Sequence, residues 1–499
     1  MFSTKEGRVE SIETVPDTEN DPIKQPYYIT NSHTAMNENK VQELQDVVIR
    51  FSGDSGDGMQ LTGTLFSDTS ALLGNGISTF PDYPAEIRAP QGTVAGVSGF
   101  QVHFGAKRQL NPGDFCDVLI AMNPAALKAN RKWLKPGATV ILDEDSITEE
   151  HLRKAGFATL DPIRELNLED FNVVVPNITE MTKAALADSG LDNKAMVKCK
   201  NMFALGICFY LYNRPEDHAK HYLDSKFAKK NPAIAEANKR AIDAGYNYAA
   251  NTHQFANTYT VASGQMEKGT YRSISGNVAT AWGLCAASEK SGLPLFCGSY
   301  PITPATVILE ELAKRKDLGV KTVQAEDEIA GICTAIGASF AGNFAVTTTS
   351  GPGLSLKSEA LGLAVMTELP LVVVDVQRGG PSTGLPTKTE QSDLQQALYG
   401  RNGESPVAVI AASMPSDCFH YAFEAGRIAM EHMTPVVLLS DGFIANGSEP
   451  WKIPSMKDYP TINPPIIDKT EDGGPFMPYA RNEKLARSWA FPGKAGLEH

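Results

Sequence analysis

The sequence has none of the cysteine grouping that marks metal-clustered or disulfide-rich proteins. Its seven cysteines are scattered along the chain, and no two of them stand in C-x-x-C spacing. A zinc site or an iron–sulfur cluster needs grouped thiolates. We therefore expect no metal site in this chain and interpret the cysteines as reduced thiols packed in the core.

Long apolar runs and an excess of basic residues are also missing. No apolar stretch approaches the roughly 20 residues that span a bilayer, and the N-terminus has no basic start followed by an apolar core, as a signal peptide would. The 58 acidic residues exceed the 45 lysines and arginines, which gives a net charge of -13. Because nucleic acid phosphates select basic surfaces, we expect a cytoplasmic protein that binds neither nucleic acid nor membranes.

At 499 residues the chain is too long for one compact core, and its pattern divides it into five segments. Residues 1–44 are polar and predict a flexible extension. Residues 45–225 alternate strand and helix patterns, which predicts a first α/β domain, and residues 226–267 predict a linker. Residues 268–449 alternate more regularly and predict a doubly wound α/β domain. Residues 450–499 are rich in proline and predict an extended linker.

The predicted strands of the second domain are followed by residues that can bind a ligand: hydroxyl residues, an acid, glycines and an arginine. Ligands of doubly wound sheets bind at the carboxyl ends of the strands, so polar residues at those ends indicate a site. Four successive strands are followed, in order, by Tyr300, Pro301 and Thr303; by Glu328; by Ser350, Gly351 and Gly353; and by Arg378 and Thr383.

Each of these residues also has a structural interpretation. Glu328 is an acidic residue at a helix start, where the helix dipole favours it. The helix that follows is rich in alanine and glycine, however, and such a helix can approach a ligand closely. Arg378 can form a surface ion pair, but it precedes two glycines and its planar fork suits a carboxylate. Their conjunction on adjacent strand ends predicts a ligand site.

Together these motifs resemble the α subunit of 2-oxoacid:ferredoxin oxidoreductases. The resemblance rests on Tyr-Pro-Ile-Thr-Pro at 300–304, Glu328 before a small-residue helix, Thr-Thr-Ser-Gly-Pro-Gly at 348–353, and Arg-Gly-Gly-Pro-Ser-Thr-Gly at 378–384. In some members a γ domain is fused ahead of the α pyrimidine domain, and the segments 82–88 and 91–92 resemble that module. The resemblance covers nearly all of residues 46–499, is closest for the 2-oxoglutarate branch, and implies a γ-type α/β domain followed by a thiamine pyrimidine-binding doubly wound α/β domain.

The resemblance implies roles for the residues at the strand ends. Glu328 would hydrogen-bond the N1′ atom of the thiamine aminopyrimidine and so activate the cofactor. Arg378 and Thr303 would hold the carboxylate and carbonyl oxygen of the 2-oxoacid, with Thr383 as a further contact. The residues implied to line the thiamine diphosphate are Tyr300, Pro301, Ser350, Gly351 and Gly353.

Two further parts of the implied enzyme have no match in this chain. Thiamine enzymes usually anchor diphosphate and Mg²⁺ through Gly-Asp-Gly and a later Asn, but the triplet at 56–58 lies in the γ-like domain and no Asn lies from 76 to 110. No cysteine set for a cluster is present either. The resemblance therefore implies a separate β subunit that carries the diphosphate anchor, Mg²⁺ and a [4Fe-4S] cluster, with ferredoxin as electron acceptor and coenzyme A as co-substrate.

The implied activity is the oxidative decarboxylation of 2-oxoglutarate to succinyl-CoA, or its reverse. Pyruvate or indolepyruvate as substrate stays open within the same class. A non-catalytic nucleotide-binding or assembly protein built on this fold is the alternative from another class. The family's α subunits continue into a further domain, so we expect residues 450–499 to lead to a C-terminal domain that is absent or truncated here.

The first domain contains a glycine-rich turn with its own candidate role. Gly53, Ser55, Gly56 and Gly58 follow a predicted strand and precede a predicted helix, a context that suits a phosphate group. Their spacing differs from the dinucleotide fingerprint. Three interpretations stay open: a coenzyme A phosphate site, as the γ resemblance allows, a dinucleotide site, or tight packing without a ligand.

Overall fold

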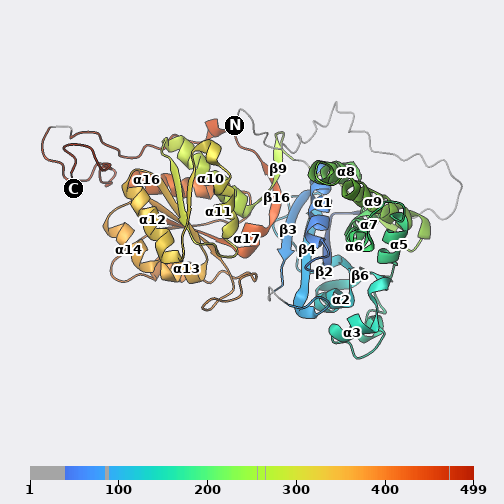
Figure 1. Ribbon diagram of the computed structural model, residues 1–499. Helices are drawn as coiled ribbons and strands as arrows, with labels where there is room; N and C mark the ends of the chain where they lie inside the picture. Colours follow the sequence, from blue (N-terminus) through green and yellow to red (C-terminus); the bar gives the residue numbers. More distant parts are fainter. Residues whose placement is uncertain (1–39, 85–88, 256, 265, 471–472, 499) are drawn as a thin grey trace. The chain divides into compact units, whose positions relative to one another are not determined.

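The computed structural model describes residues 40–84, 89–255, 257–264, 266–470 and 473–498. The chain divides into two compact units, with the boundary between Ser273 and Ile274 (Figure 1). Most of the expected N-terminal extension, residues 1–39, lies outside the described residues. Its last part forms strand β1 (Lys40–Leu44), which pairs in parallel with β8 (Asn257–Val261). This pairing joins segments far apart in sequence, so a local sequence pattern does not predict it.

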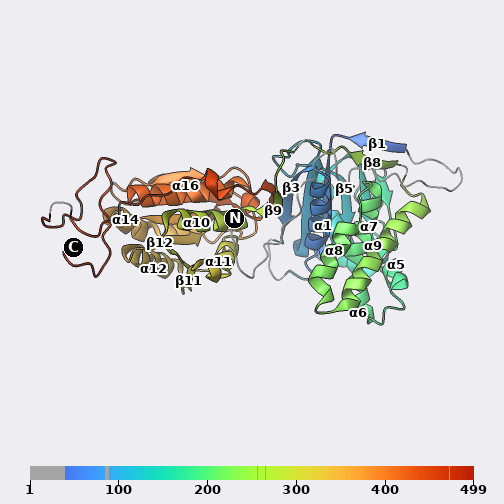
Figure 2. The same cartoon turned by 90° about the horizontal axis from the view of Figure 1, so that it is seen from above.

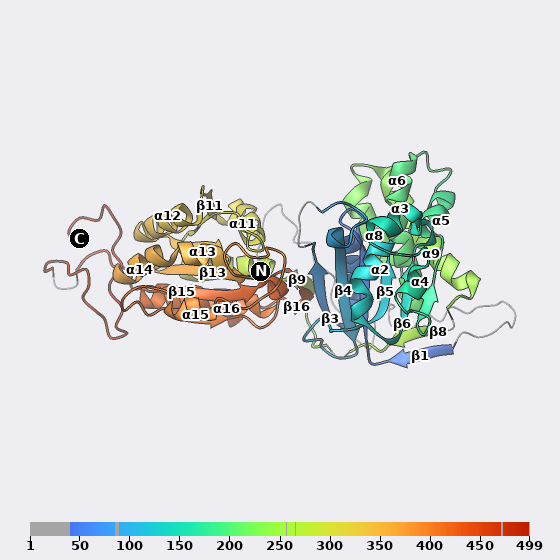
Figure 3. The ribbon, with the colours of Figure 1, turned by 90° about the horizontal axis from the view of Figure 1, so that it is seen from below.

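The first unit is built on a mixed six-stranded sheet with the order β3-β4-β2-β5-β6-β7. Figure 3 labels β3, β4, β5 and β6 of this sheet. The pairs β2–β4 and β3–β4 are antiparallel, and the remaining pairs are parallel. The strands are β2 (Asp46–Asp54), β3 (Gly76–Asp82), β4 (Val97–Gly105), β5 (Cys116–Ala121), β6 (Leu134–Leu142) and β7 (Asn172–Val174).

Helices cover both faces of this sheet. One apolar core joins α1, α7, α8 and α9 to one face, and a second core packs α2 on the other. The helices are α1 (Met59–Leu72), α2 (Pro124–Asn130), α3 (Glu149–Lys154), α4 (Pro162–Glu165), α5 (Ile178–Ala185), α6 (Asn193–Val197), α7 (Lys200–Leu211), α8 (Asp217–Leu223) and α9 (Pro232–Thr252).

The segment 226–267, expected as a linker, belongs to this first unit. It contains the 21-residue helix α9, whose buried face consists largely of alanine and glycine. A Cβ at Gly245 would overlap the backbone of Phe203, and a Cβ at Gly206 would overlap the backbone of Ile242, so α7 and α9 approach closely. Small residues give little apolar periodicity, which is why the sequence pattern predicts a linker where a packed helix lies.

The second unit is a parallel sheet with the order β11-β10-β12-β13-β15-β14. Helices α10, α11 and α16 pack on one face and α12 to α15 on the other; Figure 2 shows α16 and α12 on opposite sides. The strands are β10 (Leu295–Ser299), β11 (Lys321–Gln324), β12 (Phe344–Thr349), β13 (Leu371–Gln377), β14 (Ala408–Ala411) and β15 (Pro435–Asp441). The helices are α10 (Gly276–Ser291), α11 (Thr306–Ala313), α12 (Glu328–Phe340), α13 (Gly351–Leu356), α14 (Ser358–Met366), α15 (Leu394–Tyr399), α16 (Asp417–His432) and α17 (Gly442–Asn446).

The chain outside these sheets includes β9 (Tyr271–Ser275), β16 (Ser448–Lys452) and the segment that follows β16. That segment, expected as an extended linker, has mostly irregular backbone in its described residues but packs on the second unit. Trp489 is fully buried in the core of this unit, and the Arg487 Nε donates a 3.0 Å hydrogen bond to the Glu368 carbonyl.

Candidate functional site

The site lies where the direction of the second sheet reverses. From β10 the chain runs to β11 on one side, and from β12 it runs to β13 on the other, so the carboxyl ends of β10 and β12 flank a switch point. The Ser299 hydroxyl donates a 2.7 Å hydrogen bond to the Thr348 carbonyl and accepts one of 2.9 Å from its amide. These bonds fix the two strand ends against each other.

Glu328 is the first residue of α12, and only 8% of it is exposed. Asp327 caps the helix, because its carboxylate accepts a 2.7 Å hydrogen bond from the Ala330 amide. The Lys357 ammonium donates a 2.7 Å hydrogen bond to the Glu328 carbonyl. Within the described residues the Glu328 carboxylate itself has no hydrogen-bond partner from another side chain, so it is available to a ligand.

Lys357 is completely buried beneath this helix start. Burial lowers the pKa of the ammonium to about 8, and the nearby Glu328 carboxylate opposes that shift. A positive charge is thus held close to Glu328 without solvent. Lys357 was not predicted as a site residue, because it follows the glycine-rich turn in an otherwise ordinary helical segment.

The glycine-rich turn after β12 makes room for the Glu328 side chain. A Cβ at Gly353 would lie 2.7 Å from the Glu328 Cγ, so this glycine packs directly against the glutamate. Ser350 caps α13 by position, but its buried hydroxyl finds no partner in the described part of the chain. An unpaired buried hydroxyl beside a glycine cradle is what a polar ligand at this place would satisfy.

Arg378 connects two loops at the same edge of the sheet. Its Nη1 donates a 2.7 Å hydrogen bond to the Thr303 carbonyl, and its Nη2 donates one of 2.6 Å to the Thr383 carbonyl. Its Nε is buried, and no described residue accepts a hydrogen bond from it. Burial lowers the pKa of Arg378, and the Glu328 and Asp393 carboxylates oppose that shift. The guanidinium therefore binds both loops and keeps unused donors.

The contacts bring most of the predicted residues together. Arg378 binds Thr303 and Thr383, Gly353 packs against Glu328 and bonds Ser350, and Arg378 interacts electrostatically with Glu328 across these two groups. Gly351 begins α13. Thr303 and Thr383 contact Arg378 through their carbonyls, while both residues are exposed. Tyr300 and Pro301 follow directly after β10, with Tyr300 37% exposed.

Two buried acids near Arg378 were not predicted. Asp375 is fully buried in β13, and Asp393 precedes α15 and is 7% exposed. The sequence does contain a signal for Asp375, because it is a lone aspartate in the apolar run Leu-Val-Val-Val-Asp-Val at 371–376. Nothing local indicates that the two acids meet.

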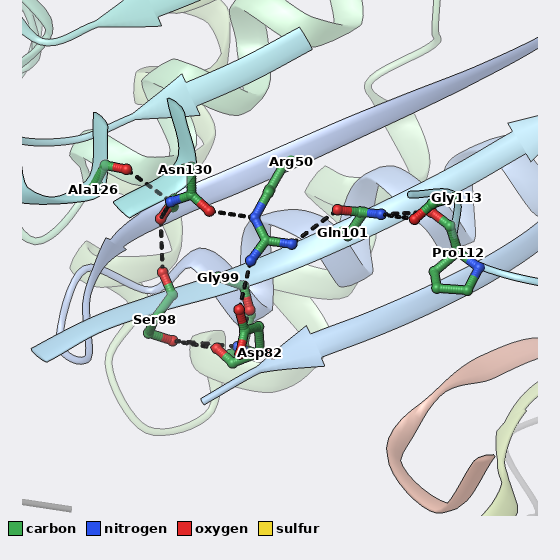
Figure 4. Close-up of polar contacts among 11 residues, drawn as sticks. Arg50, Asp82, Ser98, Gly99, Gln101, Pro112, Gly113, Ala126 and Asn130 are labelled. Atoms are coloured by element: carbon green, nitrogen blue, oxygen red, sulfur yellow. Dashed lines mark hydrogen bonds and ion pairs between the residues drawn. The ribbon is translucent and has the colours of Figure 1, made fainter. Parts of the chain in front are cut away.

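The first unit contains a separate polar network around Arg50 (Figure 4). The buried Arg50 guanidinium bonds Asn130 and Asp82, each at 2.5 Å, and Gln101 at 2.9 Å. This network fixes Asp82, which begins the γ-like motif, against the central strand β2. Residues 85–88 of that motif lie outside the described residues.

The glycine-rich turn of the first unit uses its polar groups internally. The Asp54 carboxylate accepts hydrogen bonds of 3.0 and 3.1 Å from the Gly92 amide, and the Asp57 carboxylate accepts one of 2.9 Å from the Asp54 amide. Gly58 has a φ of 76°, and a Cβ there would lie 2.5 Å from the Asn201 side chain. A Cβ at Gly53 would lie 2.7 Å from the Asp57 carboxylate, whereas a Cβ at Gly56 would make only an ordinary contact of 3.6 Å with Gln91, and Ser55 is exposed. Two carboxylates within the turn disfavour an anion, so this geometry favours the packing interpretation.

The described part of the chain lacks two features that other protein classes have. In it, no group of three or more His, Cys, Asp or Glu side chains is arranged to hold a metal ion. No helix there combines the length and the apolar character needed to cross a membrane.

Comparison with known families matches both units. Residues 48–248 match the model of the pyruvate ferredoxin/flavodoxin oxidoreductase family. Residues 289–499 match the thiamine diphosphate-binding model of pyruvate flavodoxin/ferredoxin oxidoreductases. The predicted order, a γ-type α/β domain followed by a thiamine pyrimidine-binding α/β domain, is confirmed.

Individual relatives extend this match. The chain is 55% identical to the 2-oxoglutarate oxidoreductase subunit KorA of Mycobacterium tuberculosis, over 92% of this chain and 70% of that protein. It is 39% identical to the 2-oxoglutarate synthase subunit KorA of Archaeoglobus fulgidus, over 43% of this chain and 64% of that protein. The 2-oxoglutarate:ferredoxin oxidoreductase of Magnetococcus marinus, solved with 2-oxoglutarate, coenzyme A and succinyl-CoA, has a TM-score of 0.76 at 35% identity, covering 91% of this chain and 73% of that one.

Proposed function

Because this chain belongs to the family of 2-oxoglutarate oxidoreductase KorA subunits, we propose that it is the γα-fused subunit of a thiamine diphosphate-dependent 2-oxoglutarate:ferredoxin oxidoreductase. The enzyme converts 2-oxoglutarate and coenzyme A to succinyl-CoA and CO₂ while ferredoxin is reduced, or runs in reverse. The observation that carries this proposal is the 55% identity to the mycobacterial subunit over 92% of the chain.

The residues at the switch point fit the pyrimidine half of thiamine diphosphate. The buried Ser350 hydroxyl and the Arg378 Nε have unused hydrogen-bonding capacity, and Gly351 and Gly353 let the Asp393 and Glu328 side chains pack directly against the turn. When bound, the cofactor supplies the carbon nucleophile that attacks the keto carbon. Glu328 then offers a carboxylate to the ring nitrogen N1′ and holds or moves its proton there. Tyr300 and Pro301 line the turn next to this place.

Arg378 is the proposed ligand of the 2-oxoacid carboxylate. Its guanidinium keeps free donors after binding the carbonyls of Thr303 and Thr383, and a planar fork pairs well with a carboxylate. Through those carbonyls Arg378 also holds both threonines in place. The exposed Thr303 and Thr383 side chains then contribute contacts to the keto acid.

A β subunit completes the site in this proposal. Helices α12 and α14 present exposed apolar side chains, namely Ile329 beside Glu328 and, farther along the helices, Phe340, Leu363 and Met366, with Met366 74% exposed. Such a patch beside a half-built site is typical of a protein interface. The partner contributes the diphosphate anchor, Mg²⁺ and the [4Fe-4S] cluster, and passes electrons to ferredoxin.

The cysteines agree with a cytoplasmic setting for this complex. Six of the seven are buried, and all seven are free thiols. Reducing compartments keep thiols in that state, whereas proteins in oxidising compartments are commonly cross-linked.

The test is co-expression with a β subunit and a viologen reduction assay with 2-oxoglutarate and coenzyme A. Glu328→Gln should lower kcat by about 10²–10⁴-fold, the range of general acid–base contributions. Glu326→Gln is the matched control, since Glu326 is an exposed acid two residues earlier on the same strand end. Calorimetric titration of the complex with thiamine diphosphate gives a second readout.

The outcomes separate the candidate functions. Full activity of Glu328→Gln contradicts the role of Glu328. No activity of the wild-type complex on any 2-oxoacid favours the non-catalytic binding or assembly protein. A comparison of kcat/KM for 2-oxoglutarate, pyruvate and indolepyruvate decides the substrate, because discrimination lies in that ratio.

A further inference from the structure

Two buried carboxyl groups, those of Asp375 and Asp393, interact with each other near Arg378. Asp375 is fully buried in β13, Asp393 is nearly so, and their side chains lie within hydrogen-bonding reach of each other. Among the residues that the structure describes, no group outside the pair bonds either oxygen of Asp375 or the Asp393 Oδ2. The Ser392 hydroxyl reaches the other Asp393 oxygen at 3.3 Å.

Two ionised carboxylates cannot rest together without water or a cation. Burial favours the neutral form of each acid, and the negative charge of a neighbour favours it further. A single shared proton reduces both the burial of charge and the repulsion between the two acids, because a protonated carboxyl can donate a hydrogen bond to an ionised one. Burial raises the pKa of Asp375 well above its ordinary value and raises that of Asp393 as well, so Asp375 is the acid that keeps the proton.

The pair lies against groups that the proposed function uses. A Cβ at Gly351 would lie 2.7 Å from either Asp393 oxygen, so this carboxyl packs on the start of α13. Arg378 follows Asp375 by three residues and interacts electrostatically with Asp393 and Glu328. The other charged group that faces Asp393 is Glu390.

The shared proton balances the charges of the buried ionisable groups around Arg378. With Asp375 neutral, the carboxylates of Asp393 and Glu328 are offset by two buried cations, Arg378 and Lys357. If Asp375 were also ionised, a surplus negative charge would lie beneath the substrate. A 2-oxoacid with two carboxylates would be repelled strongly, because charges in a site shielded from water interact strongly.

We infer that Asp375 and Asp393 share one proton at neutral pH and act as a positioning pair that lets Arg378 hold a dicarboxylic 2-oxoacid. The shared proton is independent of the proposed function, whereas the positioning role rests on it. The two parts are therefore tested separately.

Infrared spectroscopy of the full chain in D₂O tests the proton. At pH 7 the wild-type minus Asp375→Asn difference spectrum should contain the carbonyl stretch of a protonated carboxylic acid. Asp317→Asn is the control, because Asp317 is exposed, and its difference spectrum should contain only a carboxylate. A wild-type minus Asp375→Asn spectrum with carboxylate bands alone overturns the shared proton.

Steady-state kinetics of the assembled complex test the positioning role. The KM for 2-oxoglutarate of the wild type should rise at alkaline pH by about tenfold or more as Asp375 loses its proton, equivalent to about 1.4 kcal/mol. Asp375→Asn should show a smaller rise than the wild type, because asparagine stays neutral and only the loss of the Lys357 charge remains. The same alkaline rise in both proteins overturns the role. A wild-type complex inactive on every 2-oxoacid overturns it too, together with the proposed function, while the infrared result for the proton stands.

Discussion

The Lys357 ammonium donates a 2.7 Å hydrogen bond to the backbone carbonyl of Glu328, from a position with no exposure to solvent. A lysine buried in this way is costly, since its charged form leaves water for one backbone partner. This free-energy cost of burial falls at the first turn of α12, which carries Glu328, the residue proposed to bind the cofactor. The contact therefore links the stability of the fold to the geometry of Glu328.

Lys357→Met should separate stability from activity. Burial lowers the pKa of Lys357 from 10.5 to about 8, so the fold disfavours its charge at neutral pH. Replacing a buried charge with an apolar side chain of similar length should raise the free energy of unfolding by about 1–3 kcal/mol at pH 7. The kcat should fall about tenfold because the Glu328 turn loses its tether. Urea unfolding and viologen reduction measure the two effects.

The pH dependence of that stability difference has a definite sign. The cost of the lysine charge is present below pH 8 and disappears as pH rises from about 8 to 10.5. The stability advantage of Lys357→Met should shrink over the same window. An advantage that stays constant from pH 7 to pH 10 contradicts the buried charge.

Arg378→Lys should weaken substrate binding more than turnover. The arginine fork bonds the carbonyls of Thr303 and Thr383 at once, and a lysine cannot span both. Loss of one charge-assisted hydrogen bond, worth about 1.5–3 kcal/mol, should raise the KM for 2-oxoglutarate at least tenfold. Arg427→Lys is the control, because the Arg427 guanidinium contacts only carboxylates on its own helix. An equal change in KM for both variants contradicts the assignment.

The sequence predicts most of this site because the second sheet is parallel. Parallel strands place their carboxyl ends at one edge, so Thr303, Glu328 and Arg378 could be grouped without knowing the strand order. The pairing of Asp375 with Asp393 could not be predicted, because it depends on the packing of a loop 18 residues later. Lys357 was missed for a similar reason, since a lysine in a helix is ordinarily exposed.

The first unit was harder to predict where packing depends on small residues. Helix α9 contacts α7 through Gly245 and other small residues, and such a face resembles a polar linker in sequence. The strand β1 was missed because its partner β8 lies more than 200 residues away. Close approach of backbones and distant strand pairing both leave little trace in local composition.

Gly353→Ala should disturb Glu328 directly. The added Cβ would lie 2.7 Å from the Glu328 Cγ and would also press on Thr349, so the side chain or the turn must shift. Overpacking of this kind costs about 1–3 kcal/mol, and the displaced carboxylate should lower kcat. Gly337→Ala is the matched control, because a Cβ there meets no atom within 4 Å in the interior of α12. It should gain about 0.5–1 kcal/mol of stability from helix propensity. Equal kcat values for the two variants contradict the contact.

Asp375→Asn should change how stability depends on pH. Burial and the neighbouring Asp393 raise the pKa of Asp375 well above its ordinary 3.8, so the folded protein holds a proton that the unfolded chain releases. The stability that this proton contributes is fully present below pH 3.8 and is lost as pH rises toward the folded pKa. Asparagine has no such dependence and can still donate to Asp393. The variant should therefore match the wild type near pH 4 and become progressively more stable than it at pH 6 and pH 8, as urea unfolding will measure. Asp317→Asn should leave the pH dependence as in the wild type, and a pH-independent gap for Asp375→Asn would mean that Asp375 is ionised in the fold.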